Sequence, residues 1–272
     1  MNIMMRKILA TLIRLINKSI LFSLTKRIKI FPVLLGSKTY YSQLSKYKYS
    51  VQEFHEQTNT LYVARRGRLN LYFNGIDERL LNLQNQYFTS TLDNLPQQSL
   101  IVDIGANIGE FSVYWSRQGY DVIAFEPDPI EYACLQQNLP KEQCQNIGLW
   151  NRPTTLKFYL DNDTGDSSLF KSKENQKSIS IKVDTLDNTL LSYEGVIGLI
   201  KLEAEGGEPE ILEGSIKTLL RTHYISIDAG LERGLKKEST LKEVCNILFS
   251  HGFEICDFNP IRFTLLFKNL QL

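Results

Sequence analysis

The chain has 272 residues, 43% of them hydrophobic, which is enough for a substantial buried core and excludes a disordered protein. Its net charge of +1 conceals an uneven distribution: residues 1–52 hold ten Lys and Arg and no acid. The remainder holds 21 basic against 30 acidic side chains. A basic arm ahead of an acidic body predicts an anionic partner for the arm. The acidic body, without a recognition motif, argues against nucleic acid as that partner.

The cysteines and the apolar runs indicate the compartment. The four cysteines are far apart, without a C-x-x-C pair or a nearby histidine cluster, which argues against a disulfide scaffold and against a zinc site. No apolar run reaches the roughly 18–20 residues of a membrane span. Residues 8–13 are apolar, but Arg14 ends this run and no cleavage site of small residues follows. We therefore expect free thiols, no bound metal and a cytoplasmic protein.

Residues 8–21 have the spacing of an amphipathic helix. Apolar side chains cover one broad face, and Lys7, Arg14 and Lys18 gather on the opposite face. Such a helix could lie in a membrane interface with its cations on anionic head groups, at the inner face of the membrane. It could equally pack on its own domain with the basic face in water. Amphipathicity alone does not distinguish the two.

The next segment gives weaker signals. Residues 40–60 are polar and aromatic without a clear period, and residues 60–63 and 68–73 are predicted as short strands. The turn between them carries Arg65 and Arg66, with Arg68 just beyond it. These cations could meet a phosphate or carboxylate of a substrate, or be a solvated turn. A helix is expected over residues 78–87.

From residue 99 strands alternate with helices. Strands are predicted over residues 100–104, 122–126, 146–150, 196–203 and 224–228, and helices over 111–117, 130–138, 209–220 and 240–250. Residues 155–160 and 179–183 alternate apolar and polar side chains, as in an antiparallel pair with one face in water. Residues 253–258 and 262–267 should form a closing hairpin. This order predicts a doubly wound α/β sheet.

A glycine-rich loop follows the first of these strands. Gly105, Ala106 and Gly109 allow a tight turn and close approach of a ligand to the backbone, ahead of a helix N-terminus. The next strand ends at Glu126, which suits a grip on ribose hydroxyls. The spacing is not the dinucleotide G-x-G-x-x-G, so an adenosine without a pyrophosphate fits better.

Four motifs in this order resemble the FkbM family of S-adenosylmethionine-dependent methyltransferases. They are DIGANIG (103–109), AFEPDP (124–129), GDSSL (165–169) and KLEAEG (201–206). The similarity runs from about residue 70 to the C-terminus. It implies a class I, Rossmann-like fold whose seven-stranded, mostly parallel sheet has an antiparallel last strand, with S-adenosylmethionine as the cofactor.

The resemblance also implies site residues. The loop 103–109 would wrap the methionine part of the cofactor, Glu126 would hold the ribose, Pro127 and Asp128 would border the adenine, and residues 166–168 would lie over the site. Asp103 could instead only cap the turn. The expected cofactor-binding residues are Asp103, Gly105, Ala106, Asn107, Gly109, Glu126, Pro127, Asp128, Ser167 and Ser168.

Acidic residues are the expected catalytic groups. Glu203 ends a buried strand at the edge where open α/β sheets bind ligands, and Asp166 and Asp228 are expected near it. Glu205 is expected to be structural. No motif surrounds the three histidines. An EF-hand counted from Asp161 fails, because its sixth and twelfth positions are not Gly and Glu.

The sequence thus predicts two parts: residues 1–95, a basic helix with a lid or cap region, and residues 96–272, a methyltransferase domain. The expected reaction is methyl transfer to a hydroxyl of a sugar, glycan or secondary metabolite, and the basic arm would suit a lipid-linked saccharide. Two alternatives are a catalytically silent binding module on the same fold and an NAD-dependent oxidoreductase, against which the missing G-x-G-x-x-G argues. The acceptor, the general base, assistance by a metal and the oligomeric state are left open.

Overall fold

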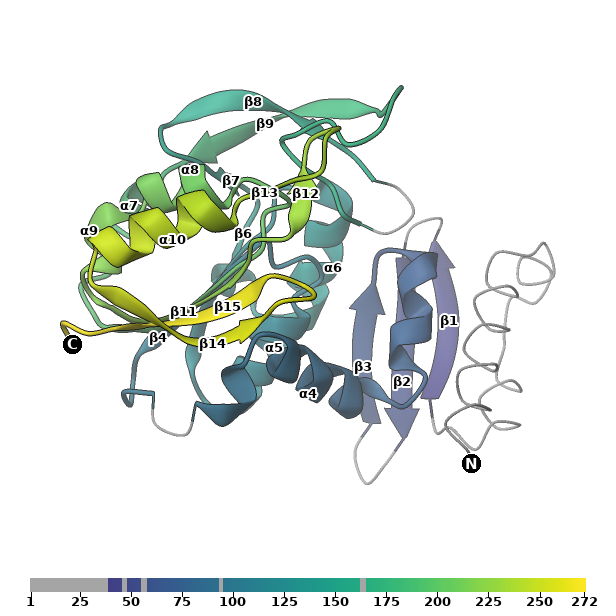
Figure 1. Ribbon diagram of the computed structural model, residues 1–272. Helices are drawn as coiled ribbons and strands as arrows, with labels where there is room; N and C mark the ends of the chain where they lie inside the picture. Colours follow the sequence, from purple (N-terminus) through teal and green to yellow (C-terminus); the bar gives the residue numbers. More distant parts are fainter. Residues whose placement is uncertain (1–38, 46–47, 55–57, 93–94, 162–164) are drawn as a thin grey trace.

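The computed structural model describes residues 39–45, 48–54, 58–92, 95–161 and 165–272 (Figure 1). Its centre is a seven-stranded sheet in the order β14-β15-β11-β10-β4-β5-β6. These strands are β4 (Leu100–Ile104), β5 (Asp121–Phe125), β6 (Cys144–Gln145), β10 (Ile197–Leu202), β11 (Thr222–Asp228), β14 (Phe253–Asn259) and β15 (Thr264–Asn269). Neighbours pair in parallel except β15, which is antiparallel to both β11 and β14. The predicted doubly wound sheet with an antiparallel last strand is confirmed.

Helices cover both faces of this sheet (Figure 1). The side chains of β4 alternate, so Val102 packs with Leu212 and Val244 on one face while Ile101 packs with Phe111 and Trp115 on the other. The first face carries α7 (Leu186–Thr189), α8 (Glu208–Glu213), α9 (Ile216–Leu219) and α10 (Leu241–Ser250). The second carries α4 (Ile76–Gln86), α5 (Glu110–Arg117) and α6 (Pro129–Asn138). Because both faces are buried, the central strands are continuous apolar runs.

The helix predicted over 209–220 is interrupted. It divides into α8 and α9 at Gly214 and Ser215. The backbone of Trp150 passes close here: a Cβ added at Gly214 would lie 2.2 Å from the carbonyl oxygen of Trp150. The chain therefore turns at a glycine that gives room to another segment, and a single straight helix was the wrong prediction.

The N-terminal part forms a separate small sheet of β1 (Thr39–Ser45), β2 (Lys48–Phe54) and β3 (Thr58–Val63), paired antiparallel. The strand predicted at 60–63 is confirmed, whereas β1 and β2 carried no clear signal. The strand predicted over 68–73 is wrong: residues Arg66–Tyr72 form the 3-10 helix η1. Leu69 and Tyr72 are buried, three residues apart, as the period of a 3-10 helix requires. The helix predicted at 78–87 is confirmed as α4.

This N-terminal part packs on the helices of the second face. Asn138 of α6 donates to the carbonyl of Tyr62 in β3 and accepts from its amide, and α4 lies beside α5 (Figure 1). The boundary at residues 95 and 96 stays a prediction. The helix expected at 8–21 lies outside the described residues. Among the helices that the structure describes, none combines the length and apolar character needed to cross a bilayer.

Smaller elements surround the carboxyl edge of the sheet. The expected antiparallel pair is confirmed as β8 (Thr154–Tyr159) and β9 (Ser178–Asp184), which β7 (Gly148–Leu149) joins in parallel. The segment between β8 and β9 carries residues 165–169. A two-stranded ribbon, β12 (Leu231–Arg233) with β13 (Glu238–Ser239), follows β11. The remaining described elements are two short 3-10 helices, η2 (Thr89–Thr91) and η3 (Lys141–Gln143).

Candidate active site

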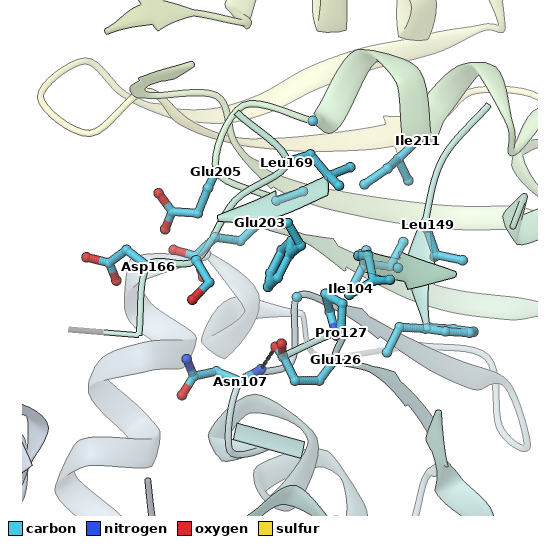
Figure 2. A pocket seen from close by; sticks show the side chains of 18 of the residues that line it. Ile104, Asn107, Glu126, Pro127, Leu149, Asp166, Leu169, Glu203, Glu205 and Ile211 are labelled. Atoms are coloured by element: carbon cyan, nitrogen blue, oxygen red, sulfur yellow. Dashed lines mark hydrogen bonds between the residues drawn. The ribbon is translucent and has the colours of Figure 1, made fainter. Parts of the chain in front are cut away.

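A hollow opens at the carboxyl ends of β4, β5 and β10. Its empty volume is about 800 Å³, which includes the solvent space at its open mouth. One end is apolar, with Leu149 and Ile211, whereas Asp166 and Glu205 lie at the other end (Figure 2). Parallel strands place their carboxyl ends at one edge, where open α/β sheets bind their ligands. We refer to this hollow as the pocket.

The glycine-rich loop forms the floor of the pocket. Gly105 has a φ of +69° and Gly109 a φ of +87°, both in the left-handed region that favours glycine. A Cβ at Gly105 would lie 1.8 Å from the carbonyl oxygen of Glu203, so the loop rests directly on the main chain that follows β10. The amides of Gly105 and Ala106 both donate to the carbonyl of Phe125, at 3.1 and 3.0 Å. The sequence therefore requires glycine here for the turn and for clearance.

Glu126 lies in the pocket at the end of β5, and its carboxylate is fixed by the backbone. Its Oε2 accepts from the amide of Asn107 at 2.8 Å (Figure 2). Its Oε1 accepts from the amide of Asp128 at 2.7 Å. Burial, with the nearby acids Glu131 and Asp128, raises its pKa to about 8, although these two amides act in the opposite direction. A carboxylate has about four acceptor positions, so two remain for a ligand.

Asp128 follows Pro127, which lines the pocket, but does not line the pocket itself. Asp128 is buried and accepts from the amide of Ile130 at the start of α6, from Arg65 Nη2 and from Ser167 Oγ, each at 2.9 Å. Arg65 is also 2.9 Å from Glu131. Arg65 is 1% exposed, so the solvated alternative for the arginine turn is wrong at this residue. Asp128 thus connects the start of α6, the turn between β3 and η1, and the segment over the pocket.

That segment connects two sides of the pocket. Ser167 lines the pocket, accepts from the amide of Asp161 and donates to Asp128. Ser168 Oγ donates to the carbonyl of Glu205 at 2.8 Å. Asp166 lies at the mouth with a side chain 52% exposed. Of the three residues predicted to lie over the site, Asp166 and Ser167 line the pocket, and a role of these residues at a cofactor stays a prediction.

A buried lysine joins the acids beneath the loop. Lys201 Nζ is 3.4 Å from Asp103 Oδ1 and 3.3 Å from Glu203 Oε2, and it donates to the carbonyls of Gly105 (2.8 Å) and Ile104 (3.3 Å). Asp103 is fully buried and also accepts from Ser112 Oγ at 2.7 Å. Both contacts of Asp103 are therefore internal, as in the structural alternative. Lys201 was not predicted as a site residue, although a lysine inside an apolar strand is a signal.

Glu203 lines the pocket and is an ionised acceptor. Burial acts to raise its pKa, but Lys201 and the hydroxyl of the buried Tyr87 lower it, and the lowering prevails. Tyr87 comes from the end of α4, and its ring also lies 5.5 Å from Lys201 Nζ. Residues far apart in the chain thus hold one carboxylate in its charged form at the edge of the pocket.

The structure distributes the other acids unevenly. Asp166 and Glu203 line the same pocket, whereas Asp228 is buried at the end of β11, 3.1 Å from Arg262 Nη2. Burial and the neighbouring Glu203 raise the pKa of Asp228. Glu205 was expected to be structural, but it lines the pocket, and burial with Glu232 beside it raises its pKa to about 10. Glu208 holds the turn instead, accepting from the amides of Ala204 and Gly206.

Across the residues that the structure describes, no three or more His, Cys, Asp or Glu side chains form a group that could hold a metal ion.

Comparison with known proteins identifies the family. Residues 103–255, more than half of the chain, match the methyltransferase FkbM domain. "Methyltransferase sdnD" of Sordaria araneosa is 28% identical over 200 residues, covering 58% of this chain and 76% of the relative. "Methyltransferase 1" of Beauveria bassiana is 26% identical over 193 residues, covering 61% and 76%.

Among solved structures, the methyltransferase FkbM of Methylobacillus flagellatus is 18% identical with a TM-score of 0.46. The match covers 75% of this chain and 54% of that one, so the chain spans about half of that structure. The fold, the ordered motifs and the match over residues 103–255 lead to one conclusion. The chain belongs to the FkbM family of methyltransferases.

Proposed function

We propose that the chain transfers a methyl group from S-adenosylmethionine to a hydroxyl of a sugar, glycan or secondary metabolite. The observation that carries the proposal is Glu126, whose carboxylate is fixed by two amides and keeps acceptor positions for two ribose hydroxyls. The apolar end of the pocket, with Leu149 and Ile211, suits an adenine ring. The acids at the other end suit a cationic ligand. These residues fit the cofactor, which supplies a methyl group on a positively charged sulfur.

The acidic residues around the pocket would position the acceptor and accept its proton. Methyl transfer to an alcohol needs alignment of the reacting groups, so positioning supplies much of the acceleration. We propose that the carboxylate of Glu203 accepts the proton of the acceptor's hydroxyl, since Lys201 and Tyr87 keep that carboxylate ionised. Asp166 at the mouth would orient the acceptor. Asp228 would hold Arg262 in place, and the charge of Arg262 helps to lower the pKa of Glu203.

Transfer of labelled methyl groups tests this proposal directly. Purified protein is incubated with S-adenosylmethionine carrying a labelled methyl group and a panel of hydroxylated sugars, glycans and small metabolites. We expect label in an ether of at least one acceptor, and loss of that product in Glu203→Gln. Binding of the cofactor without transfer to any acceptor would favour the silent binding module, and binding of NAD in its place would favour the oxidoreductase.

We also propose that the basic arm, residues 1–52, places the enzyme on an anionic membrane and that its acceptor is a lipid-linked saccharide. The arm has ten cations and no acid, and such segments gain about 1 kcal/mol per Lys or Arg near an anionic surface. The full chain should sediment with vesicles containing anionic lipid at low salt. A full-length variant with Arg6, Lys7, Arg14 and Lys18 changed to Gln should bind clearly less. Equal binding of the two proteins, or none by either, would contradict the proposal.

A further inference from the structure

The polar end of the pocket contains a cation from outside the matched family region. Arg68 belongs to η1, which precedes residues 103–255, and it lines the pocket together with Gly105 and Asn107. Its Nη1 is 4.0 Å from Asp166 Oδ1. Asp166 lies at the end of the pocket opposite Leu149 and Ile211 (Figure 2). Arg68 is therefore at the polar end, away from the apolar end proposed for adenine.

Glu110 fixes the position of Arg68. It is buried at the start of α5, and its carboxylate accepts from Arg79 Nε and Nη2 at 2.7 and 2.8 Å and from the Tyr72 hydroxyl at 2.6 Å. Arg68 Nη2 stands 3.5 Å from the same carboxylate. Two arginines thus share one buried carboxylate, whose closest hydrogen bonds come from Arg79 and Tyr72. The side chain of Arg68 is only 21% exposed, so this charge is held in a largely dry setting.

We infer that Arg68 binds the α-carboxylate of the cofactor's amino-acid end, an inference that rests on the proposed use of S-adenosylmethionine. If the adenine occupies the apolar end and Glu126 the ribose, the amino-acid part extends toward Gly105, Asn107 and Arg68. A carboxylate that leaves water needs a charged hydrogen-bonding partner. The guanidinium fork matches a carboxylate with two parallel donors, which lysine does not offer. The N-terminal part would therefore complete the cofactor site.

A cycle of two ligands and two proteins tests this inference. S-Adenosylhomocysteine and its decarboxylated analogue, which keeps the adenosine, the sulfur and the amine, are titrated by calorimetry into the parent and into Arg68→Met. The analogue lacks the carboxylate that would form a charged hydrogen-bonded pair with Arg68. The parent should therefore bind S-adenosylhomocysteine roughly 10- to 100-fold more tightly than the analogue. Arg68→Met should lose about that factor for S-adenosylhomocysteine and change by less than about threefold for the analogue.

Two further variants sharpen the result. Arg68→Lys keeps the charge without the fork and should fall between the parent and Arg68→Met. Arg117→Met removes a surface arginine that pairs with Asp77 and should bind both ligands as the parent does.

The outcomes separate the two proposals. Equal loss for both ligands in Arg68→Met, or equal affinity of the parent for both ligands, overturns the role of Arg68 and leaves the cofactor assignment standing. A folded parent that binds neither ligand overturns the cofactor assignment itself. If thermal melting shows that Arg68→Met does not fold, the comparison of the two ligands on the parent decides whether the carboxylate is recognised, and Arg68→Lys decides whether Arg68 recognises it.

Discussion

Exchange of Glu126 for glutamine should weaken binding of S-adenosylhomocysteine on the order of 100-fold, because two charge-assisted hydrogen bonds to the ribose are lost or reduced. The amide has one acceptor oxygen, whereas both carboxylate oxygens already accept from the amides of Asn107 and Asp128. The amide nitrogen of the variant would face one of those backbone donors. Isothermal titration at pH 8 measures the effect.

The matched control is Glu142→Gln, which makes the same exchange at an exposed position and should leave binding unchanged. The pH dependence gives a second readout. Burial raises the pKa of Glu126 to about 8, and the ribose needs the ionised form as an acceptor. Affinity of the parent should therefore increase as the pH rises toward 8 and level off above it, whereas Glu126→Gln should show no such rise. Unchanged affinity in Glu126→Gln would remove the main support for the cofactor site.

Replacement of Lys201 by methionine should reduce the free energy of unfolding by about 3–5 kcal/mol, the usual effect of removing one member of a buried ion pair. Asp103 and Glu203 would then lie near each other without a cation, and the carbonyls of Ile104 and Gly105 would lose a donor. Denaturant unfolding of the parent and the variant, followed by circular dichroism, measures the difference.

The same variant should respond to pH in a defined direction. Without Lys201 the burial of Glu203 loses its main compensating charge, so the pKa of Glu203 rises and the folded variant holds more protons than the folded parent. Its deficit should therefore grow as the pH rises from about 5 to 8 and shrink as the pH falls. Lys217→Met, at an exposed position, should stay within about 0.5 kcal/mol of the parent. A deficit that is equally large at both pH values would argue against this role of Lys201.

Sequence patterns predicted the central sheet because its strands are short, buried on both faces and separated by helices. They failed where burial is decided by distant partners. Over residues 68–73 Leu69, Leu71 and Phe73 alternate with polar side chains as in a strand, yet the buried pair is Leu69 and Tyr72. The strands β1 and β2 lack a clear alternation, and their pairing with β3 gives them their structure.

In the site, too, local features could be predicted from the sequence and long-range contacts could not. The loop at Gly105 and the acid Glu126 were predictable, since a turn and a strand end are local features. The contacts of Lys201, Tyr87 and Arg65 were not predictable, because each side chain has at least one partner more than 60 positions away in the chain. The sequence could not decide whether Asp103 binds the cofactor or only supports the turn. The structure favours the supporting role, because Asp103 contacts Ser112 and Lys201.

The contact between Gly105 and residue 203 has a consequence for protein engineering. The loop touches the carbonyl oxygen of residue 203 and leaves its side chain out of that contact. Position 105 therefore admits only glycine, and a library for new acceptors should leave residues 105 and 203 unchanged. Asp166, whose side chain is exposed at the mouth of the pocket, can be varied while the loop and Glu203 stay as they are. Directed evolution of specificity can begin at this position.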